Sequence, residues 1–244
     1  HARDFTVRHR AELFPGTPVA ACGINDLKSV PPGAEDMNII IERLAHVETL
    51  TAALRQNPGT RKVHVVIDGT LTGKSILREF LEQARALSGQ VEVDVAPPMT
   101  RAQLEVFARE RARGEIIYLL VYFQDAAGEV FAAEDIPRAL AAASPVPVYV
   151  AWDFQMGTGV VGGCVTSAFG HGHKAAATLL DRLAGKNPPH AYSGLQEVNR
   201  HTYDFAALSR FSIPVETLPQ GALVLNRPLS FFELHREVIL WALG

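Results

Sequence analysis

Short hydrophobic runs alternate along most of the chain with segments whose hydrophobic residues recur at helical spacing. Apolar runs of about four to eight residues predict buried strands, and apolar residues three and four positions apart predict amphipathic helices. The pattern predicts strands at 18–22, 38–41, 63–67, 91–95, 116–123, 148–152, 160–166 and 198–205. It predicts helices at 3–13, 46–54, 75–87, 101–113, 136–143 and 174–183, and a short helix that ends at Arg210.

This alternation of strand and helix predicts an α/β fold with a mostly parallel sheet that helices cover on both faces. A chain of 244 residues forms either one such domain or two lobes of roughly 100 residues each. The pattern changes after Pro188, where a strand, a short helix and an irregular tail are expected. Apolar residues then return at helical spacing, which predicts a last helix over 231–243.

Composition narrows the function classes. The sequence has no stretch of about 18 apolar residues, so none of it is expected to span a membrane. A net charge of −3 without basic runs argues against nucleic acid as a partner. The first residues are polar and do not resemble a signal peptide. Cys22 and Cys164 lie in apolar, strand-like segments and are interpreted as buried thiols, while a disulfide between them stays open.

The segment from Asp68 to Ser75 follows a predicted strand and opens a predicted helix. A nucleotide-binding P-loop needs four residues between its first glycine and the Gly-Lys pair, whereas Gly69 and Gly73 enclose three. A glycine-rich turn still offers free N–H groups and a positive helix end, which suit a carboxylate or another anion. A plain turn with a capped helix is the alternative interpretation.

Two further motifs are weaker. His171-Gly-His173 has no neighbouring cluster of metal ligands, so we interpret these residues as surface or capping histidines. Gly157 to Gly162 has the glycine spacing of a dinucleotide site, but a strand-like segment follows where that motif requires a helix. The sequence contains no recognisable catalytic motif, and it therefore predicts no catalytic residue, metal or cofactor.

Polar and aromatic residues follow several predicted strands. In open parallel sheets, ligands bind outside the carboxyl ends of the strands. Each such residue alone is more often a strand terminator, but several at equivalent positions favour a shared cleft. A carboxylate there would hold an ammonium or hydroxyl group, and the aromatic rings would stack on a ring. The set comprises Asn25, Asp68, Tyr122, Phe123 and Asp153.

Segments spread along the whole chain resemble the ABC-transporter substrate-binding-protein-like family, which has a type I periplasmic binding fold. The resemblance is strongest to members that form the extracytoplasmic sensor regions of membrane histidine kinases and diguanylate cyclases. Its specificity comes from the order and spacing of the pieces. They are LFPGTPVAACGIN (13–25), VHVVIDGTLTG (63–73), IIYLLVYFQDAAG (116–128), PVYVAWDFQMGTGVVGG (147–163), LAGKNP (183–188) and LPQGALVLNRPLSFFELHR (218–236).

The resemblance implies two Rossmann-like lobes with parallel sheets, joined by hinge strands, with a small ligand clamped between them. It implies a partial first lobe at 1–45, a second lobe at 46–150, and crossings at 151–217 that complete both. Residues 218–244 would form a tail and a helix leading toward a membrane segment. Family members begin with further strand-helix units, so the first lobe is expected to be incomplete at its N-terminus.

The same resemblance implies the ligand-binding residues. Positions from the first lobe, from the turn of the second lobe and from near the hinge would line the cleft. These positions are Gly23, Ile24 and Asn25; Asp68, Thr70, Thr72 and Gly73; and Tyr122, Asp153, Phe154 and Gly157.

The expected function is non-enzymatic: a periplasmic sensor domain clamps a small-molecule solute and signals to a kinase or cyclase domain in the same protein. Membrane contact would come only through a tether outside this chain. Amino acids, including aromatic ones, are ligands of relatives, while sugars, purines and small acids stay open. A receptor for an ABC importer is the first alternative, which a stop codon rather than a transmembrane helix after Gly244 would indicate. A nucleotide-dependent α/β enzyme that uses the 68–75 turn is the second.

Overall fold

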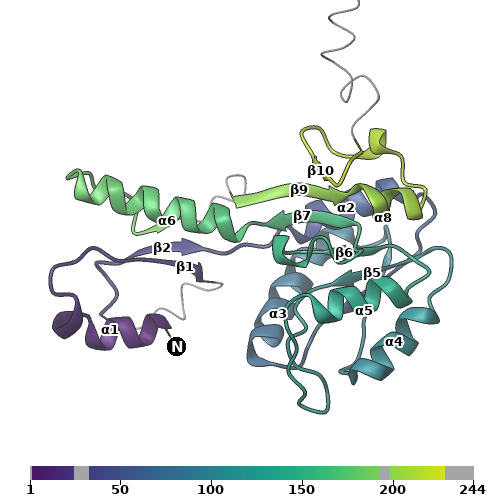
Figure 1. Ribbon diagram of the computed structural model, residues 1–244, viewed down its shortest axis with the longest axis horizontal. Coiled ribbons are helices and arrows are strands. Elements are labelled where there is room, and N and C mark those ends of the chain that lie inside the picture. Colours follow the sequence, from purple (N-terminus) through teal and green to yellow (C-terminus); the bar gives the residue numbers. More distant parts are fainter. Residues whose placement is uncertain (1, 25–32, 193–197, 229–244) are drawn as a thin grey trace, which may run out of the picture.

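The computed structural model describes residues 2–24, 33–192 and 198–228. The protein is an α/β protein with a small lobe and a large lobe, each built around its own sheet (Figure 1). This arrangement confirms the predicted fold class. The predicted site residue Asn25 and the predicted helix over 231–243 lie outside the described residues.

The small lobe holds a three-stranded parallel sheet in the order β1-β2-β8. Its strands are β1 (Ala20–Ile24), β2 (Asn38–Ile41) and β8 (Ala191–Tyr192). Helix α1 (Ala2–Leu13) and helix α6 (Ala168–Leu183) lie on opposite sides of this sheet (Figure 1). A small cluster of buried residues forms the core of the lobe: Ala34, Met37, Ile39 and Ile41.

The large lobe holds a seven-stranded sheet in the order β10-β9-β7-β6-β5-β3-β4. All neighbouring strands run parallel except β7 and β9, which are antiparallel. The parallel sheet predicted from the alternation is therefore confirmed. The strands are β3 (Lys62–Val66), β4 (Glu92–Val95), β5 (Glu115–Leu119), β6 (Val148–Val150), β7 (Gly162–Thr166), β9 (Asn199–Asp204) and β10 (Leu223–Leu225).

Helices cover both faces of the large sheet and form two cores. Side chains of β5 alternate between them: Ile116 and Tyr118 join the core with α2, α3 and α8, while Ile117 and Leu119 join the core with α4 and α5. Burial on both faces explains why these strands are continuous apolar runs. The helices are α2 (His46–Gln56), α3 (Leu71–Ala84), α4 (Arg101–Arg109), α5 (Asp135–Ala143) and α8 (Phe205–Arg210), with short 3₁₀ turns at Arg85–Leu87, Asp153–Gln155 and Val215–Thr217.

Side chains at the N-cap positions determine where three of the helices begin. Thr100 caps α4, because its side chain accepts a hydrogen bond from the backbone N–H three residues further on, that of Gln103. Thr70 and Ser167 cap α3 and α6 in the same way, so both helices begin earlier than the apolar spacing predicts. The reason is that their first turns bury little: Leu71 is 87% exposed and Phe169 is 81% exposed.

The other differences between the predicted and the observed elements concern the ends of strands and two short strands. The strands predicted at 116–123 and 148–152 end at Leu119 and Val150, and beyond these residues the pairing continues only as single contacts, such as the isolated bridge between Trp152 and Thr166. Strands β8 and β10 were not predicted, since two or three residues carry too little pattern. Two interpretations were wrong: Cys22 is exposed on the edge strand β1, and His171 is buried rather than on the surface. Both cysteines are free thiols.

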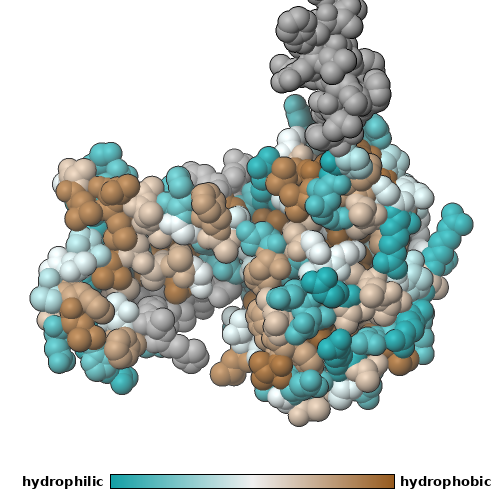
Figure 2. All heavy atoms as spheres, in the orientation of Figure 1, coloured by the Kyte–Doolittle hydropathy of each residue, from teal (hydrophilic) through white to brown (hydrophobic). Residues whose placement is uncertain are grey.

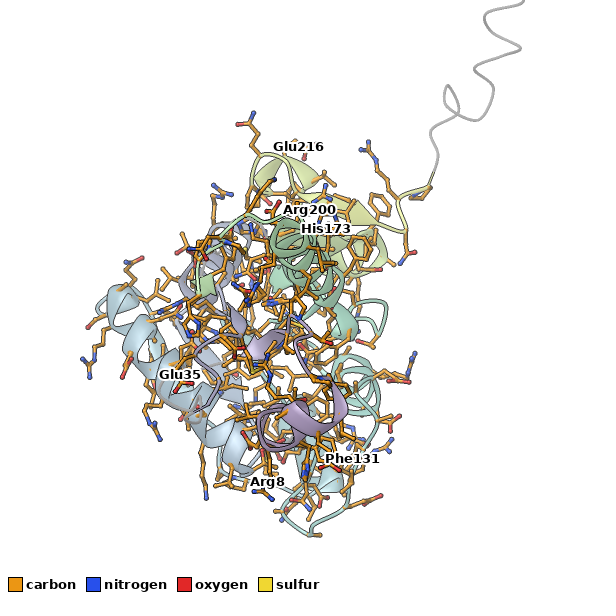
Figure 3. The ribbon with its side chains drawn as sticks, turned by 90° about the vertical axis from the view of Figure 1, so that its left-hand side faces the viewer. Arg8, Glu35, Phe131, His173, Arg200 and Glu216 are labelled. Carbon is orange, nitrogen blue, oxygen red and sulfur yellow. The ribbon has the colours of Figure 1, made fainter. Side chains whose placement is uncertain are left out.

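The chain passes between the lobes from β2 to α2, from β7 to α6, and from β8 to β9. Near the second and third passages, His173 of α6 and Arg200 of β9 line one surface hollow and lie beside each other (Figure 3). None of the helices in the described ranges combines the length and hydrophobicity needed to cross a lipid bilayer.

Gly162 is a position in β7 that tolerates no side chain. Its φ is +127°, and a Cβ would lie 2.0 Å from the carbonyl oxygen of Thr202 on β9. We therefore expect Gly162→Ala to lower the free energy of unfolding by about 3 kcal/mol in urea denaturation. Gly172→Ala is the matched control, because this helical glycine has no atom within 4 Å of the added Cβ. The control should be stabilised by about 0.5 kcal/mol, and equal losses in both variants would contradict the account.

Candidate functional site

The two lobes face each other at the carboxyl ends of their parallel strands. The ends of β1 and β2 come from the small lobe, and the ends of β3, β5 and β6 come from the large lobe. Figure 2 shows the molecular surface hollowed between the lobes. A chain of contacts joins residues at or just after these strand ends, and we call this set the interlobe site. It comprises Gly23, Glu42, Asp68, Phe123, Trp152 and Phe154.

Glu42 connects the small lobe to the crossing segment of the large lobe. Its Oε1 accepts a hydrogen bond of 2.8 Å from Nε1 of Trp152, and its backbone N–H donates to the carbonyl of Ile24. A Cβ on Gly23 would lie 3.6 Å from the other carboxylate oxygen, Oε2. The two predicted residues Gly23 and Ile24 are therefore adjacent to a carboxylate whose Oε2 is uncommitted, in that no described residue donates a hydrogen bond to it.

Sequence reasoning missed both Glu42 and Trp152 as site residues. Glu42 follows the buried strand Asn38–Ile41, which is the same position that Asp68 has after its own strand. The strand-end rule applied to that run would have found it. Trp152 was assigned to the last position of a buried strand, but the strand ends at Val150, and the indole of Trp152 reaches the other lobe.

Three aromatic rings form a row on the large lobe. The ring centroids of Trp152 and Phe154 lie 6.0 Å apart at 28°, and those of Phe154 and Phe123 lie 6.1 Å apart at 32°. Trp152 is 6% exposed, whereas Phe123 and Phe154 are 36% and 38% exposed. Such a row offers apolar ring surface on which a flat ligand group can stack.

Asp68 holds two loops together. Its Oδ2 accepts from the N–H of Phe123 at 2.8 Å, and its Oδ1 accepts from the N–H and the hydroxyl of Thr70 at 3.1 and 2.5 Å. Thr70 in turn accepts from the N–H of Gly73, where a Cβ would lie 2.4 Å from Asp68. All these contacts are internal, so Asp68 positions Phe123 and the start of α3.

The first turn of α3 is open. Thr72 is exposed there, beside the exposed Leu71. The first N–H groups of a helix have no intrahelical acceptor, and the helix dipole gives this end a partial positive charge. One of these N–H groups, that of Gly73, donates to the side-chain oxygen of Thr70. The turn is thus a capped helix start, which was the alternative interpretation, and the anion site expected there stays a prediction.

The structure separates the remaining predicted residues from the aromatic row. Tyr122 is 5% exposed, and its hydroxyl donates to the carbonyl of Met99 in the core of the large lobe. Burial raises the pKa of this hydroxyl. Asp153 accepts from the N–H of Ala168 at 3.1 Å, at the start of α6. Gly157 is exposed in the following turn, where it has a φ of +77°.

His171 is buried near the same crossing. Its Nε2 lies 3.2 Å from the hydroxyl oxygen of Thr166, and its Nδ1 has no hydrogen-bond partner within the described ranges. Burial lowers the pKa of His171, and the carboxylates of Glu42 and Asp153 oppose this shift. Among the residues that the structure describes, no three His, Cys, Asp or Glu side chains gather as a metal site.

No protein-family model matches the sequence, and no curated protein matches it either. Three solved structures are similar in fold. A substrate-binding protein with adhesive properties from Clostridium difficile, in a ligand-free, open structure, has a TM-score of 0.64 at 10% identity, over 86% of this chain and 72% of that chain. A conserved domain protein from Vibrio cholerae has a TM-score of 0.58 at 14% identity, over 85% and 71% of the two chains.

The third structure is an ABC domain in complex with L-Trp from Streptococcus pneumonia. It has a TM-score of 0.55 at 13% identity, over 83% of this chain and 66% of that chain. These likenesses show that the chain has the two-lobed α/β fold of substrate-binding proteins. The predicted type I periplasmic binding architecture is thus confirmed as a fold.

The role of Asp68 gives a prediction. Both of its carboxylate oxygens accept from N–H groups, so in Asp68→Asn the amide NH₂ must face a donor. We expect this variant to lose about 1–3 kcal/mol of unfolding free energy. Asp153→Asn is the control, because within the described residues only Oδ2 of Asp153 accepts a hydrogen bond. Urea denaturation should show a loss below about 0.5 kcal/mol for the control, and indistinguishable variants would argue against the proposed role.

Proposed function

We propose that this chain is a non-enzymatic, extracytoplasmic domain that clamps a small solute between its lobes. The observation that carries the proposal is the interlobe site, in which Glu42 of one lobe is bonded to Trp152 of the other. Polar groups and exposed rings gather there from five parallel strand ends, which is where open α/β sheets bind ligands. Closure of the lobes about the crossing segments would bury a solute on this surface.

The chemistry of the site favours an amino acid with a ring in its side chain. The row of Phe123, Phe154 and Trp152 would stack on the ring. The uncommitted oxygen of Glu42 would accept hydrogen bonds from the ammonium group. The open first turn of α3 would hold the carboxylate. The L-Trp in the similar ABC domain from Streptococcus pneumonia supports this class of ligand.

The sensor role rests on the resemblance of residues 218–236 and on the position of β10. Strand β10 pairs with β9 in parallel register, Val224 opposite Tyr203, and β9 receives the chain from β8 of the small lobe. Movement of the small lobe would therefore act on β9 and on the strand beside it. We infer that closure reaches a membrane-linked kinase or cyclase domain by this route. A receptor that delivers solute to an ABC importer would use the same site without that output.

A ligand screen tests the binding function. We expect L-Trp, L-Tyr or L-Phe to raise the thermal midpoint of the chain, since a ligand at a hundredfold excess over its Kd adds about 2.7 kcal/mol to stability. Phe154→Ala should weaken that ligand about tenfold, because it removes an exposed member of the aromatic row.

Phe14→Ala is the matched control for this screen. Phe14 is 40% exposed, close to the value of Phe154, but it precedes β1 and so lies at the other end of the small sheet. Isothermal titration calorimetry of both variants should show a loss only for Phe154→Ala. A screen in which no amino acid, sugar, nucleobase or small acid shifts the midpoint would contradict the binding function.

A second variant tests the ammonium group. Glu42→Gln keeps an oxygen that can accept from Trp152 Nε1 but removes the negative charge. We expect about a tenfold loss of affinity for an amino acid, because hydrogen bonds to charged groups are worth roughly 1.5–3 kcal/mol. The same variant should bind the corresponding des-amino acid as well as the unchanged chain does. Equal losses for both ligands would show that Glu42 acts only through the position of Trp152.

A further inference from the structure

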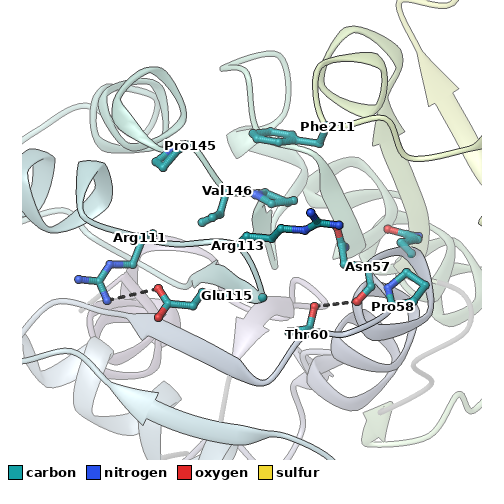
Figure 4. Close-up of a pocket in the computed structure, with 12 residues that line it drawn as sticks. Asn57, Pro58, Thr60, Arg111, Arg113, Glu115, Pro145, Val146 and Phe211 are labelled. Atoms are coloured by element: carbon teal, nitrogen blue, oxygen red, sulfur yellow. Dashed lines mark hydrogen bonds and ion pairs between the residues drawn. The ribbon is translucent and has the colours of Figure 1, made fainter.

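A second hollow lies on the large lobe, at the opposite ends of the strands from the interlobe site. It is bounded by the segments that precede β3, β5 and β6 and by the residue after α8 (Figure 4). Its volume is about 530 Å³, within the range of about 300–1,000 Å³ that small-molecule sites occupy. The lining segments are 56–58 with Thr60, Arg111 with 113–115, 145–147 and Phe211.

Two arginines and one carboxylate line this cavity. Arg111 is fixed by neighbours: its Nε donates to the carbonyl of Phe107 at 2.8 Å, and its guanidinium lies 4.1 Å from the centroid of that ring. Its Nη1 is 3.7 Å from Oε2 of Glu115, which also accepts from the N–H of Ala112. The charges of Arg111 and Glu115 therefore offset each other.

Arg113 leaves a positive charge without a partner. Within the described residues, its guanidinium makes no hydrogen bond or ion pair. Figure 4 shows it extending across the cavity between Val146 and Asn57. Gln56, which is 4% exposed, also lines the cavity; its Oε1 accepts from the Tyr149 hydroxyl at 2.7 Å, and its Nε2 has no hydrogen-bond partner in the described ranges. Arg113 therefore offers unpartnered donors to the cavity, while the charge of Glu115 is already offset by Arg111.

The remaining wall is apolar and held in place. The guanidinium of Arg210 lies 4.8 Å from the ring centroid of Phe211 and donates to the carbonyls of Ala141 and Ser144 at 2.6 and 2.7 Å. These contacts fix the ring beside the segment that leads into β6. Other apolar lining residues are Pro58, Pro145, Val146 and Pro147.

From this arrangement we propose that the cavity is a second ligand site, which binds a small organic acid. The anionic group binds the guanidinium of Arg113, whose planar fork matches a carboxylate or a phosphate. The apolar body of the ligand packs on Phe211 and the prolines. An inorganic anion alone would leave the apolar wall without contacts. The site is independent of the interlobe site, since the two occupy opposite ends of the same strands.

The test uses the whole chain in Tris buffer, with titrations followed by amide NMR. The probes are benzoate, phenyl phosphate, the neutral isostere benzamide and inorganic phosphate. We expect one of the two aromatic acids to bind saturably and benzamide to bind at least about tenfold more weakly, because the charged hydrogen bond is lost. The acid that binds more tightly identifies the anionic group.

Variants assign the binding to the cavity. Arg113→Gln should weaken the acid about tenfold or more while leaving the thermal midpoint unchanged. Arg78→Gln, at an exposed arginine of α3, is the matched control and should retain full affinity. Phe154→Ala should also retain it, which separates this site from the interlobe site.

Three outcomes would overturn the proposal. In the first, neither aromatic acid binds saturably. In the second, Arg113→Gln binds the acid as tightly as the unchanged chain. In the third, inorganic phosphate binds as tightly as phenyl phosphate, which would leave the apolar wall without a role.

Discussion

Burial of the central strands on both faces is the constraint on which the rest of the structure depends. Strand β5 sends alternate side chains into two cores, so a polar group on either face needs a buried partner, as the Tyr118 hydroxyl has in His46. Further polar side chains gather where the strands end. Because β3, β5 and β6 are parallel, they stop at the same edge of the sheet. The convergence of Asp68, Phe123 and Trp152 follows from this packing.

The hydrophobic pattern predicts this part of the structure well, because burial is what the pattern measures. It places β2 at its observed bounds and finds each central strand. It fails where residues are buried without belonging to a strand. Leu120 and Val121 belong to the same core, so the alternation of β5 is already lost before Tyr122. The direction of the Tyr122 side chain, into the core toward Met99, was therefore not readable from the sequence.

The roles of the carboxylates were equally beyond the sequence. Asp68 and Glu42 both follow buried strands, and nothing in the residue type distinguishes them. The difference is that Thr70 and Phe123 supply donors to Asp68, whereas Glu42 keeps one oxygen uncommitted beside Gly23. Which donors reach a carboxylate depends on loops that meet only in the folded chain. A strand-end rule can locate such groups, but the tertiary contacts decide which of them faces a ligand.

The order of the strands along the chain also has a consequence for how the protein forms. The central sheet from β3 to β6 is contiguous, and its strands can pair as soon as residue 150 has been synthesised. Of the small-lobe strands in the described residues, β1 and β2 precede that point, and an isolated pair of strands is marginal in water. The small lobe gains α6 and β8 only after residue 192. The central strands of the large lobe thus precede the completion of the small lobe, and the large lobe gains β9 and β10 afterwards.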